Sequence, residues 1–173
     1  LNQMWSRLCN GQSYFANIHF GTGTGTPIGT RTSLFTHLGT KSAITEEAIK
    51  AFPISRIKRK IVLNPEEYVG QNIREVGISF DSSTASLVTH AMLKDAEGNP
   101  ISILKKNTDV ITIFATVFVT FDISNPNLIF EPPVTNSLVN YLVGLSSAPT
   151  GSFGLNEMLS SFARLGSTAS VTW

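Results

Sequence analysis

The sequence predicts a mainly β protein: an antiparallel β-sandwich with short helices and a helical or extended C-terminal appendage. Stretches that alternate apolar with polar residues, rich in β-branched and aromatic side chains, recur between turn-forming residues in the first two thirds of the chain. Apolar residues at helical spacing are concentrated after that point. The length of 173 residues suits one domain, so we divide the chain into a sandwich at residues 11–124 and a docking segment at residues 125–173.

The expected strands are identified by the alternation of apolar and polar residues, because successive side chains of a strand point to opposite faces. A strand is expected at residues 14–20, and the strand expected at residues 54–63 places Ile57, Ile61 and Leu63 on one face. Two more strands are expected at residues 73–80 and 87–94. The longest covers residues 110–121, where the odd positions are all apolar and the even positions after Val110 alternate Thr with Phe. The turns between them are Asn64-Pro65, Asp81-Ser82-Ser83 and Gly98-Asn99-Pro100.

Helix signals are fewer. Thr45-Glu46-Glu47 predicts the start of a short helical turn that Pro53 ends. Two longer helices are expected at residues 135–145 and 156–165. Such helices need a surface to pack on, and their apolar faces are candidate interface positions: Leu138, Tyr141, Leu142, Leu155 and Phe162.

Charge is low and unevenly distributed. Charged residues make up 14% of the chain, against about 25% in typical soluble domains. The net charge is +1, and no charged residue lies between Pro132 and Asn156. An uncharged tract of this length packs either on its own domain or on another chain; we expect the second. The first residues show neither an initiator Met nor the order of a signal peptide, so we expect a chain that was processed or cut from a longer one.

Composition also excludes several classes of function. The near-zero net charge argues against nucleic acid or a membrane surface as partner, and no apolar run is long enough to span a bilayer. With Cys9 as its single cysteine, the chain cannot form an internal disulfide framework or a multi-cysteine zinc site.

One dense basic cluster lies on the strand at residues 54–63. Alternation places Arg56, Lys58 and Lys60 on one face and Arg59 on the other. Such a run is usually a solvated face or a guarded strand edge; the alternative is a contact with an acidic neighbour, so these three cations are interface candidates. Nucleic-acid binding is less favoured because no aromatic residues alternate with the cations along this stretch.

No motif predicts catalysis or a cofactor. The Gly-Thr run at residues 21–30 lacks the Lys-Ser/Thr of a P-loop and the glycine spacing of a dinucleotide fold, and Pro27 removes a backbone donor. It predicts a loop with close backbone packing. His19, His37 and His90 share no metal-ligand spacing. The adjacent pairs Glu46-Glu47 and Glu66-Glu67 diverge on a strand, which makes them weak candidates for acid–base chemistry.

Four segments resemble one family. The run IHFGTGTGTPIGTRTSLFTHL at residues 18–38 is similar to a glycine-rich loop pattern of bacteriophage virion proteins. NIREVGISF at residues 72–80 and LVTHAML at residues 87–93 resemble consecutive strands of phage tail-collar fibre proteins, and ILKKNTDVITI at residues 103–113 is similar to the step into their last strand. The turn after Phe80 departs from the family pattern because it is longer and lacks glycine. Residues after 125 match nothing in the family.

The resemblance implies a structural component of a phage virion: a tail protein of the collar, baseplate or fibre attachment, with no enzymatic activity, cofactor or small-molecule substrate. Its partners would be other virion proteins and copies of itself, and it would assemble in the bacterial host cytoplasm. Low charge and 37 Ser and Thr residues suit the same interpretation. Two alternatives stay open: a head-decoration or head-fibre protein on the capsid, and a host-surface carbohydrate-binding module. Against the second, Trp5 and Trp173 lie near the chain ends.

Overall fold

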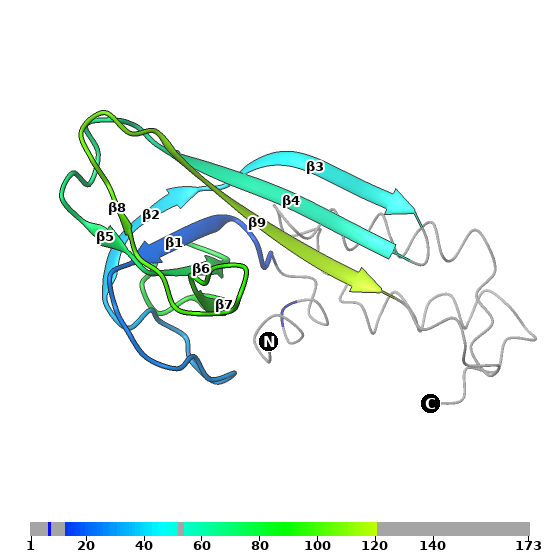
Figure 1. Ribbon diagram of the computed structural model, residues 1–173. Coiled ribbons are helices and arrows are strands. Elements are labelled where there is room, and N and C mark those ends of the chain that lie inside the picture. The colour runs from blue at the N-terminus through cyan, green and yellow to red at the C-terminus, as the bar shows by residue number, and fades with distance from the viewer. Residues whose placement is uncertain (1–6, 8–12, 52–53, 121–173) are drawn as a thin grey trace, which may run out of the picture.

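The computed structural model describes residue 7 and residues 13–51 and 54–120. These residues form nine β-strands in three antiparallel sheets, so the prediction of a mainly β, antiparallel fold is confirmed (Figure 1).

The first sheet has four strands in the order β2-β1-β6-β7. Its members are β1 (Asn17–Gly21), β2 (His37–Ser42), β6 (Glu75–Ser79) and β7 (Leu87–Met92). The inner strand β1 pairs with β2 on one side and with β6 on the other, and all of its residues after Asn17 are buried. The Gly-Thr run at residues 21–30 leaves the end of β1 and leads towards β2.

The second sheet is formed by three longer strands in the order β3-β4-β9. They are β3 (Ile44–Ala51), β4 (Ile54–Leu63) and β9 (Ile111–Thr120). Every residue of β4 has a partner on β9, from Ile54 opposite Thr120 to Leu63 opposite Ile111. The short strands β5 (Asn72–Ile73) and β8 (Ile103–Leu104) make a separate two-stranded sheet.

The hydrophobic core is shared by the two larger sheets, as in a sandwich. In Figure 1 the long strands β3, β4 and β9 lie over the four-stranded sheet. The core side chains come from the segment before β1, from both larger sheets and from Ile73 of β5: Tyr14, Phe15, Ile18, Phe20, Ile57, Ile61, Leu63, Ile73, Ile78, Val88 and Val117. Because the inward residues of β4 are Ile57, Ile61 and Leu63, the face predicted from alternation is the face that is buried.

Most expected strands are found, and the differences have physical causes. The strand expected at residues 54–63 matches β4, and the one at 110–121 matches β9 within one residue at each end. The single strand expected at residues 73–80 is interrupted at Arg74, whose N–H donates to the Gly21 carbonyl, so β5 pairs with β8 and β6 with β1.

The helical turn expected at Thr45-Glu46-Glu47 is wrong. These residues lie in β3, which pairs with β4 over almost its whole length. Cross-strand pairing therefore outweighs the local helix signal of two acidic residues. The helices expected at residues 135–145 and 156–165, and the docking segment at 125–173, lie outside the described residues.

Candidate functional site

The predicted basic cluster lies on the outward side of β4. Arg56 donates to Glu47 and Lys60 to Glu46, each at 2.5 Å, and both carboxylates come from β3. The hydrogen bond from Lys60 holds the pKa of Glu46 below its ordinary value. Lys58 lies over an aromatic ring instead, with its Nζ 4.4 Å from the centroid of Phe114.

These contacts balance much of the charge of the cluster within the chain. Two of the three cations have a carboxylate partner on the neighbouring strand, and all three are only partly buried. Exposed ion pairs of this kind add little to stability. The solvated-face interpretation therefore accounts for the cluster, and a contact with an acidic neighbour stays a prediction.

Arg59 points the other way, as the alternation predicts, and is buried in the core with 3% of its surface exposed. Its guanidinium donates to the Phe15 carbonyl and lies 5.3 Å from the Phe15 ring centroid. Burial lowers the pKa of Arg59. This cation therefore anchors the segment before β1 against β4 and is not available to a partner.

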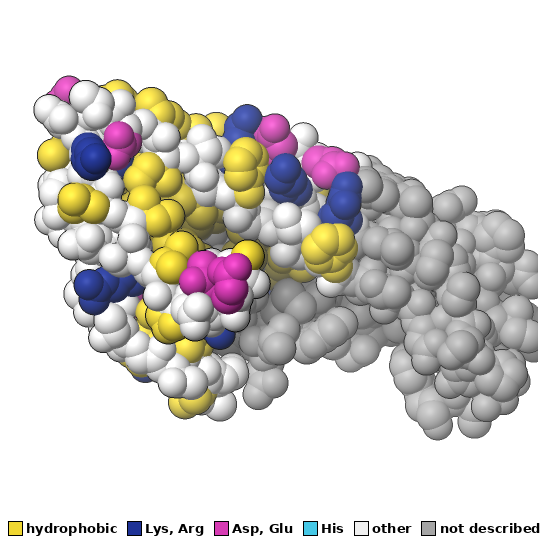
Figure 2. All heavy atoms as spheres, in the orientation of Figure 1, with side chains coloured by type: hydrophobic (Ala, Val, Ile, Leu, Met, Phe, Trp, Pro, Cys, Tyr) yellow, Lys and Arg dark blue, Asp and Glu magenta, His cyan; other side chains and the backbone are white. Residues whose placement is uncertain are grey.

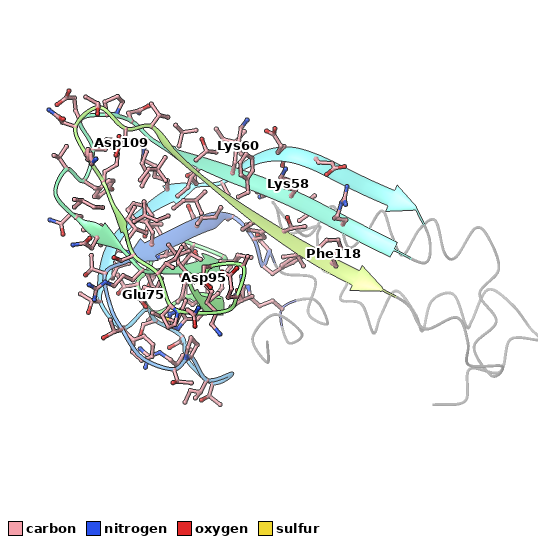
Figure 3. The ribbon with its side chains drawn as sticks, in the orientation of Figure 1. Lys58, Lys60, Glu75, Asp95, Asp109 and Phe118 are labelled. Atoms are coloured by element: carbon pink, nitrogen blue, oxygen red, sulfur yellow. The ribbon has the colours of Figure 1, made fainter. Side chains whose placement is uncertain are left out.

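The most unusual surface is the outward side of the three-stranded sheet, which we call the outer face. Large apolar side chains are exposed on it: Ile44 at 61%, Phe114 at 48% and Phe118 at 59%. Val110, which directly precedes β9, is 60% exposed. Figure 2 shows hydrophobic side chains interspersed with charged ones over this part of the molecule, and Figure 3 shows Lys58, Lys60 and Phe118 along the sheet.

The strand register explains this mixture of aromatic and basic residues. Arg56 pairs with Phe118 and Lys60 with Phe114 across β4 and β9, and the Arg56 guanidinium lies 5.9 Å from the Phe118 ring centroid. Cations above ring faces are weakly attracted to them. The basic stretch of β4 contains no aromatic residues, but the pairing of β4 with β9 places aromatic residues of β9 beside its cations.

A second cluster is buried in the four-stranded sheet around Glu75, which has no exposed surface. Its Oε1 accepts hydrogen bonds from the backbone N–H groups of Gly23 at 2.9 Å and Thr36 at 2.8 Å. Its Oε2 accepts from the Phe35 N–H at 2.9 Å and from Nε2 of His90 at 2.8 Å. Glu75 therefore ties both ends of the loop between β1 and β2 to β6.

The glycines beside Glu75 allow this close approach. A Cβ atom on Gly23 would lie 2.4 Å from the Glu75 carboxylate, and one on Gly21 would lie 2.3 Å from the Thr36 carbonyl oxygen. Gly25 has a φ of 153° and lies against the Phe35 ring. The Gly-Thr run is thus a closely packed loop, as the sequence predicts. Sequence reasoning did not single out Glu75, although it is the one acidic residue in the apolar run at residues 75–80.

The three histidines do not form a metal site within the described part of the chain, where no group of three or more potential ligands occurs. His19 and His37 both contact Oγ1 of Thr40, at 2.8 and 2.9 Å. His90 pairs with Glu75 instead. Burial lowers the pKa of His19 and of His90, which favours their neutral forms.

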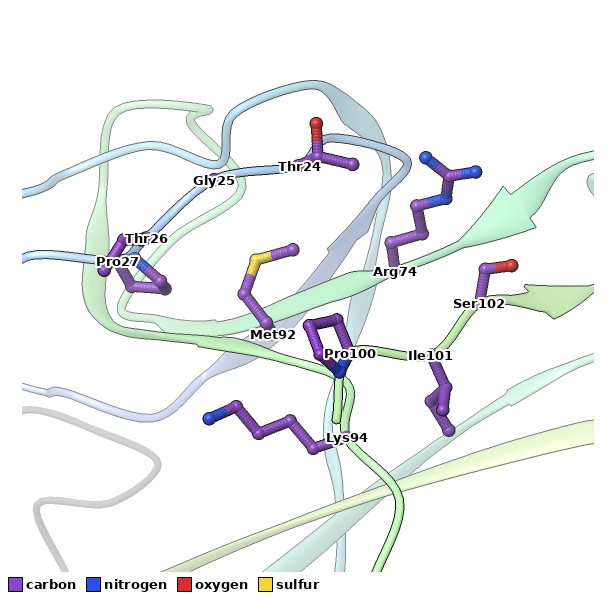
Figure 4. A pocket seen from close by; sticks show the side chains of 10 residues that line it. All are labelled: Thr24, Gly25, Thr26, Pro27, Arg74, Met92, Lys94, Pro100, Ile101 and Ser102. Atoms are coloured by element: carbon purple, nitrogen blue, oxygen red, sulfur yellow. The ribbon is translucent and has the colours of Figure 1, made fainter. Parts of the chain in front are cut away.

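A shallow hollow of about 470 Å³ lies beside the Gly-Thr run (Figure 4). Arg74 and Lys94 contribute cations to its lining, Thr24, Thr26 and Ser102 contribute hydroxyls, and the remaining lining residues are Gly25, Pro27, Met92, Pro100 and Ile101. The lining contains neither an acidic nor an aromatic side chain. Its chemistry suits a small anion with hydroxyl groups.

The other predicted interface residues, Leu138, Tyr141, Leu142, Leu155 and Phe162, lie outside the described residues. Among the residues that are described, no helix is long and apolar enough to cross a membrane.

No protein-family model, curated protein or solved structure matches this chain. The resemblance to phage tail-collar proteins, which was inferred from four sequence segments, therefore stays a prediction.

Proposed function

We propose that this chain is a structural component of a bacteriophage virion, a tail protein of the collar, baseplate or fibre attachment that assembles through protein–protein contacts. The observation that carries the proposal is the outer face of β3, β4 and β9, where Phe114 and Phe118 are about half exposed. Large aromatic side chains are enriched in protein interfaces and depleted from ordinary solvated surfaces. The resemblance of the four sequence segments to tail-collar proteins specifies the kind of assembly.

Two further features support an assembly subunit. The buried carboxylate of Glu75 has a structural role, because it accepts hydrogen bonds from the loop between β1 and β2. The lining of the hollow beside the Gly-Thr run contains no pair of groups arranged for acid–base chemistry. Charged residues are also scarce over the whole chain, at 14%. Surface that is covered in an assembly does not need solubilising charge.

Light scattering of the purified chain at several concentrations tests the proposal. We expect a defined oligomer or larger assemblies, and we expect Phe114→Ser combined with Phe118→Ser to raise the dissociation constant at least about tenfold, since buried aromatic residues carry much of the binding energy of an interface. Ile28→Ser is the matched control, because Ile28 is 61% exposed but lies in the loop between β1 and β2. A monomer of 18.7 kDa at every concentration would contradict the proposal.

A second candidate function is recognition of a host-surface carbohydrate, which the hollow beside the Gly-Thr run favours. Its hydroxyl groups and its two cations, Arg74 and Lys94, suit an acidic sugar. It ranks second because the lining has no aromatic ring on which a sugar could stack. Titration with glucuronate, with glucose as the neutral control, tests it: binding of glucuronate that is lost in Arg74→Ala supports this function, and no binding of either sugar contradicts it.

A further inference from the structure

The three-stranded sheet has two edges of very different character. The β3 edge is interrupted by a bulge between Thr45 and Glu47 and carries the two carboxylates of Glu46 and Glu47. Bulges and charges are the usual means by which proteins prevent an edge strand from pairing. β9 shows neither: it is ten residues long, has no charged residue, and its register with β4 is continuous.

Within the described residues, β9 pairs on one side only, with β4. Its other side presents backbone N–H and C=O groups along a long, uncharged edge, which is the surface that recruits another strand. The edge strands of the four-stranded sheet are shorter, with six residues each in β2 and β7. β9 is therefore the edge best suited to pairing.

The sequence of β9 reads the same in both directions on its outward side. From Thr116, the next outward residue is Phe in either direction, at 114 and 118, and two positions further along the strand the residue is Thr in either direction, at 112 and 120. The inward neighbours of Thr116 are the small apolar residues Ala115 and Val117. A strand with this symmetry is complementary to a second copy of itself in antiparallel orientation.

We propose that β9 pairs with β9 of a second copy of this chain about a two-fold axis at Thr116, which joins two three-stranded sheets into one of six strands. This inference rests on the proposed assembly function and names the partner and the register. Antiparallel pairing about that axis places Phe114 opposite the partner's Phe118, twice by symmetry, on the outer face. Directly opposed aromatic pairs stabilise antiparallel strands.

Electrostatics do not oppose this arrangement. The basic residues Arg56, Lys58 and Lys60 lie on β4, and the two copies of β4 would be separated by both β9 strands. With neighbouring strands about 4.8 Å apart, that separation is about 14 Å. It exceeds the Debye length of about 8 Å at physiological salt, so the two clusters repel each other weakly.

A single engineered cysteine tests both the pairing and its register. In a Cys9→Ser background, Thr116→Cys would lie directly opposite itself, with the two Cα atoms about 4.5 to 5.5 Å apart, a distance that a disulfide spans. Thr112→Cys is the matched control, because Thr112 is also an exposed Thr on the same face of β9. In the proposed register it lies opposite the partner's Thr120, so two copies of residue 112 are eight positions, or about 27 Å, apart.

Under mild oxidation of the full chain, we expect the Thr116→Cys variant to form covalent dimers on non-reducing gels at least ten times faster than the Thr112→Cys variant. Equal rates of cross-linking in the two variants would overturn the inference, and so would the absence of a covalent dimer from Thr116→Cys. A C-terminal segment of the same chain that lay along β9 would prevent the dimer from forming. Thr116→Lys places two like charges at the axis and should raise the dimer dissociation constant at least tenfold. Far-UV circular dichroism confirms that each variant is folded.

The molar mass measured by light scattering shows whether only the β9 pairing is wrong or whether the proposed assembly function is wrong as well. A stable dimer that does not cross-link at residue 116, or a trimer, refutes the β9 pairing and leaves the assembly function intact. A monomer at every concentration refutes both. A dimer that cross-links at residue 116 supports both.

Discussion

Replacing Glu75 with Gln should loosen the loop that connects β1 to β2. The two oxygens of Glu75 accept four hydrogen bonds, three of them from the backbone N–H groups of Gly23, Phe35 and Thr36. In Glu75→Gln, an amide NH₂ takes the place of one oxygen. If it replaces Oε2, it faces the Phe35 N–H, and two donors then point at each other. His90 can keep its contact by changing tautomer, because its Nε2 can become an acceptor.

The size of the effect follows from these contacts. A hydrogen bond to a charged group contributes about 1.5 to 3 kcal/mol, and a donor left without an acceptor in a buried site costs a similar amount. Because Glu75 is fully buried, solvent cannot replace the lost partner. We therefore expect Glu75→Gln to lower the free energy of unfolding by about 2 to 4 kcal/mol. For a chain of this length that corresponds to a melting temperature roughly 5 to 15 °C lower.

Urea unfolding followed by circular dichroism measures this difference. Glu97→Gln is the matched control, since Glu97 is exposed and surface substitutions usually change stability by less than about 0.5 kcal/mol. If Glu75→Gln and Glu97→Gln unfold at the same urea concentration as the unmodified chain, the buried carboxylate does not hold the loop and the reasoning is refuted.

Two further predictions concern the same sheet. Gly23→Ala should lower the free energy of unfolding by about 2 kcal/mol or more, because its Cβ would overlap the Glu75 carboxylate; Gly29→Ala, with nothing within 4 Å of the added atom, should leave the urea midpoint within error. Burial holds the pKa of His19 and His90 below the ordinary value of 6.5, so the unfolded chain binds protons more readily and stability should fall as the pH drops below about 6.5. The urea midpoint should therefore be lower at pH 5.5 than at pH 7.5, with a smaller difference in His19→Asn; equal midpoints in the unmodified chain would contradict the assigned burial.

The alternation of residue types was sufficient to predict β4 and β9 because both strands have one buried face and one outward face. A period of two then appears directly in the sequence. The same argument placed Arg56, Lys58 and Lys60 outward and Arg59 inward, as the structure confirms. It did not predict β2 or β3, in which apolar and polar residues do not alternate regularly and strand pairing supplies the structure.

What only the tertiary structure decided is which charged residues are buried and which apolar residues are exposed. Glu75 and Lys105 have no exposed surface, and Lys105 donates to the carbonyls of Pro65 and Lys106; in the sequence they look like any other charged residues. Conversely, the even positions of β9 alternate Thr with Phe, and both Phe114 and Phe118 are exposed although large aromatic side chains are usually buried. The reason is physical: alternation specifies that two faces differ, whereas the packing of one sheet on another determines which face is covered.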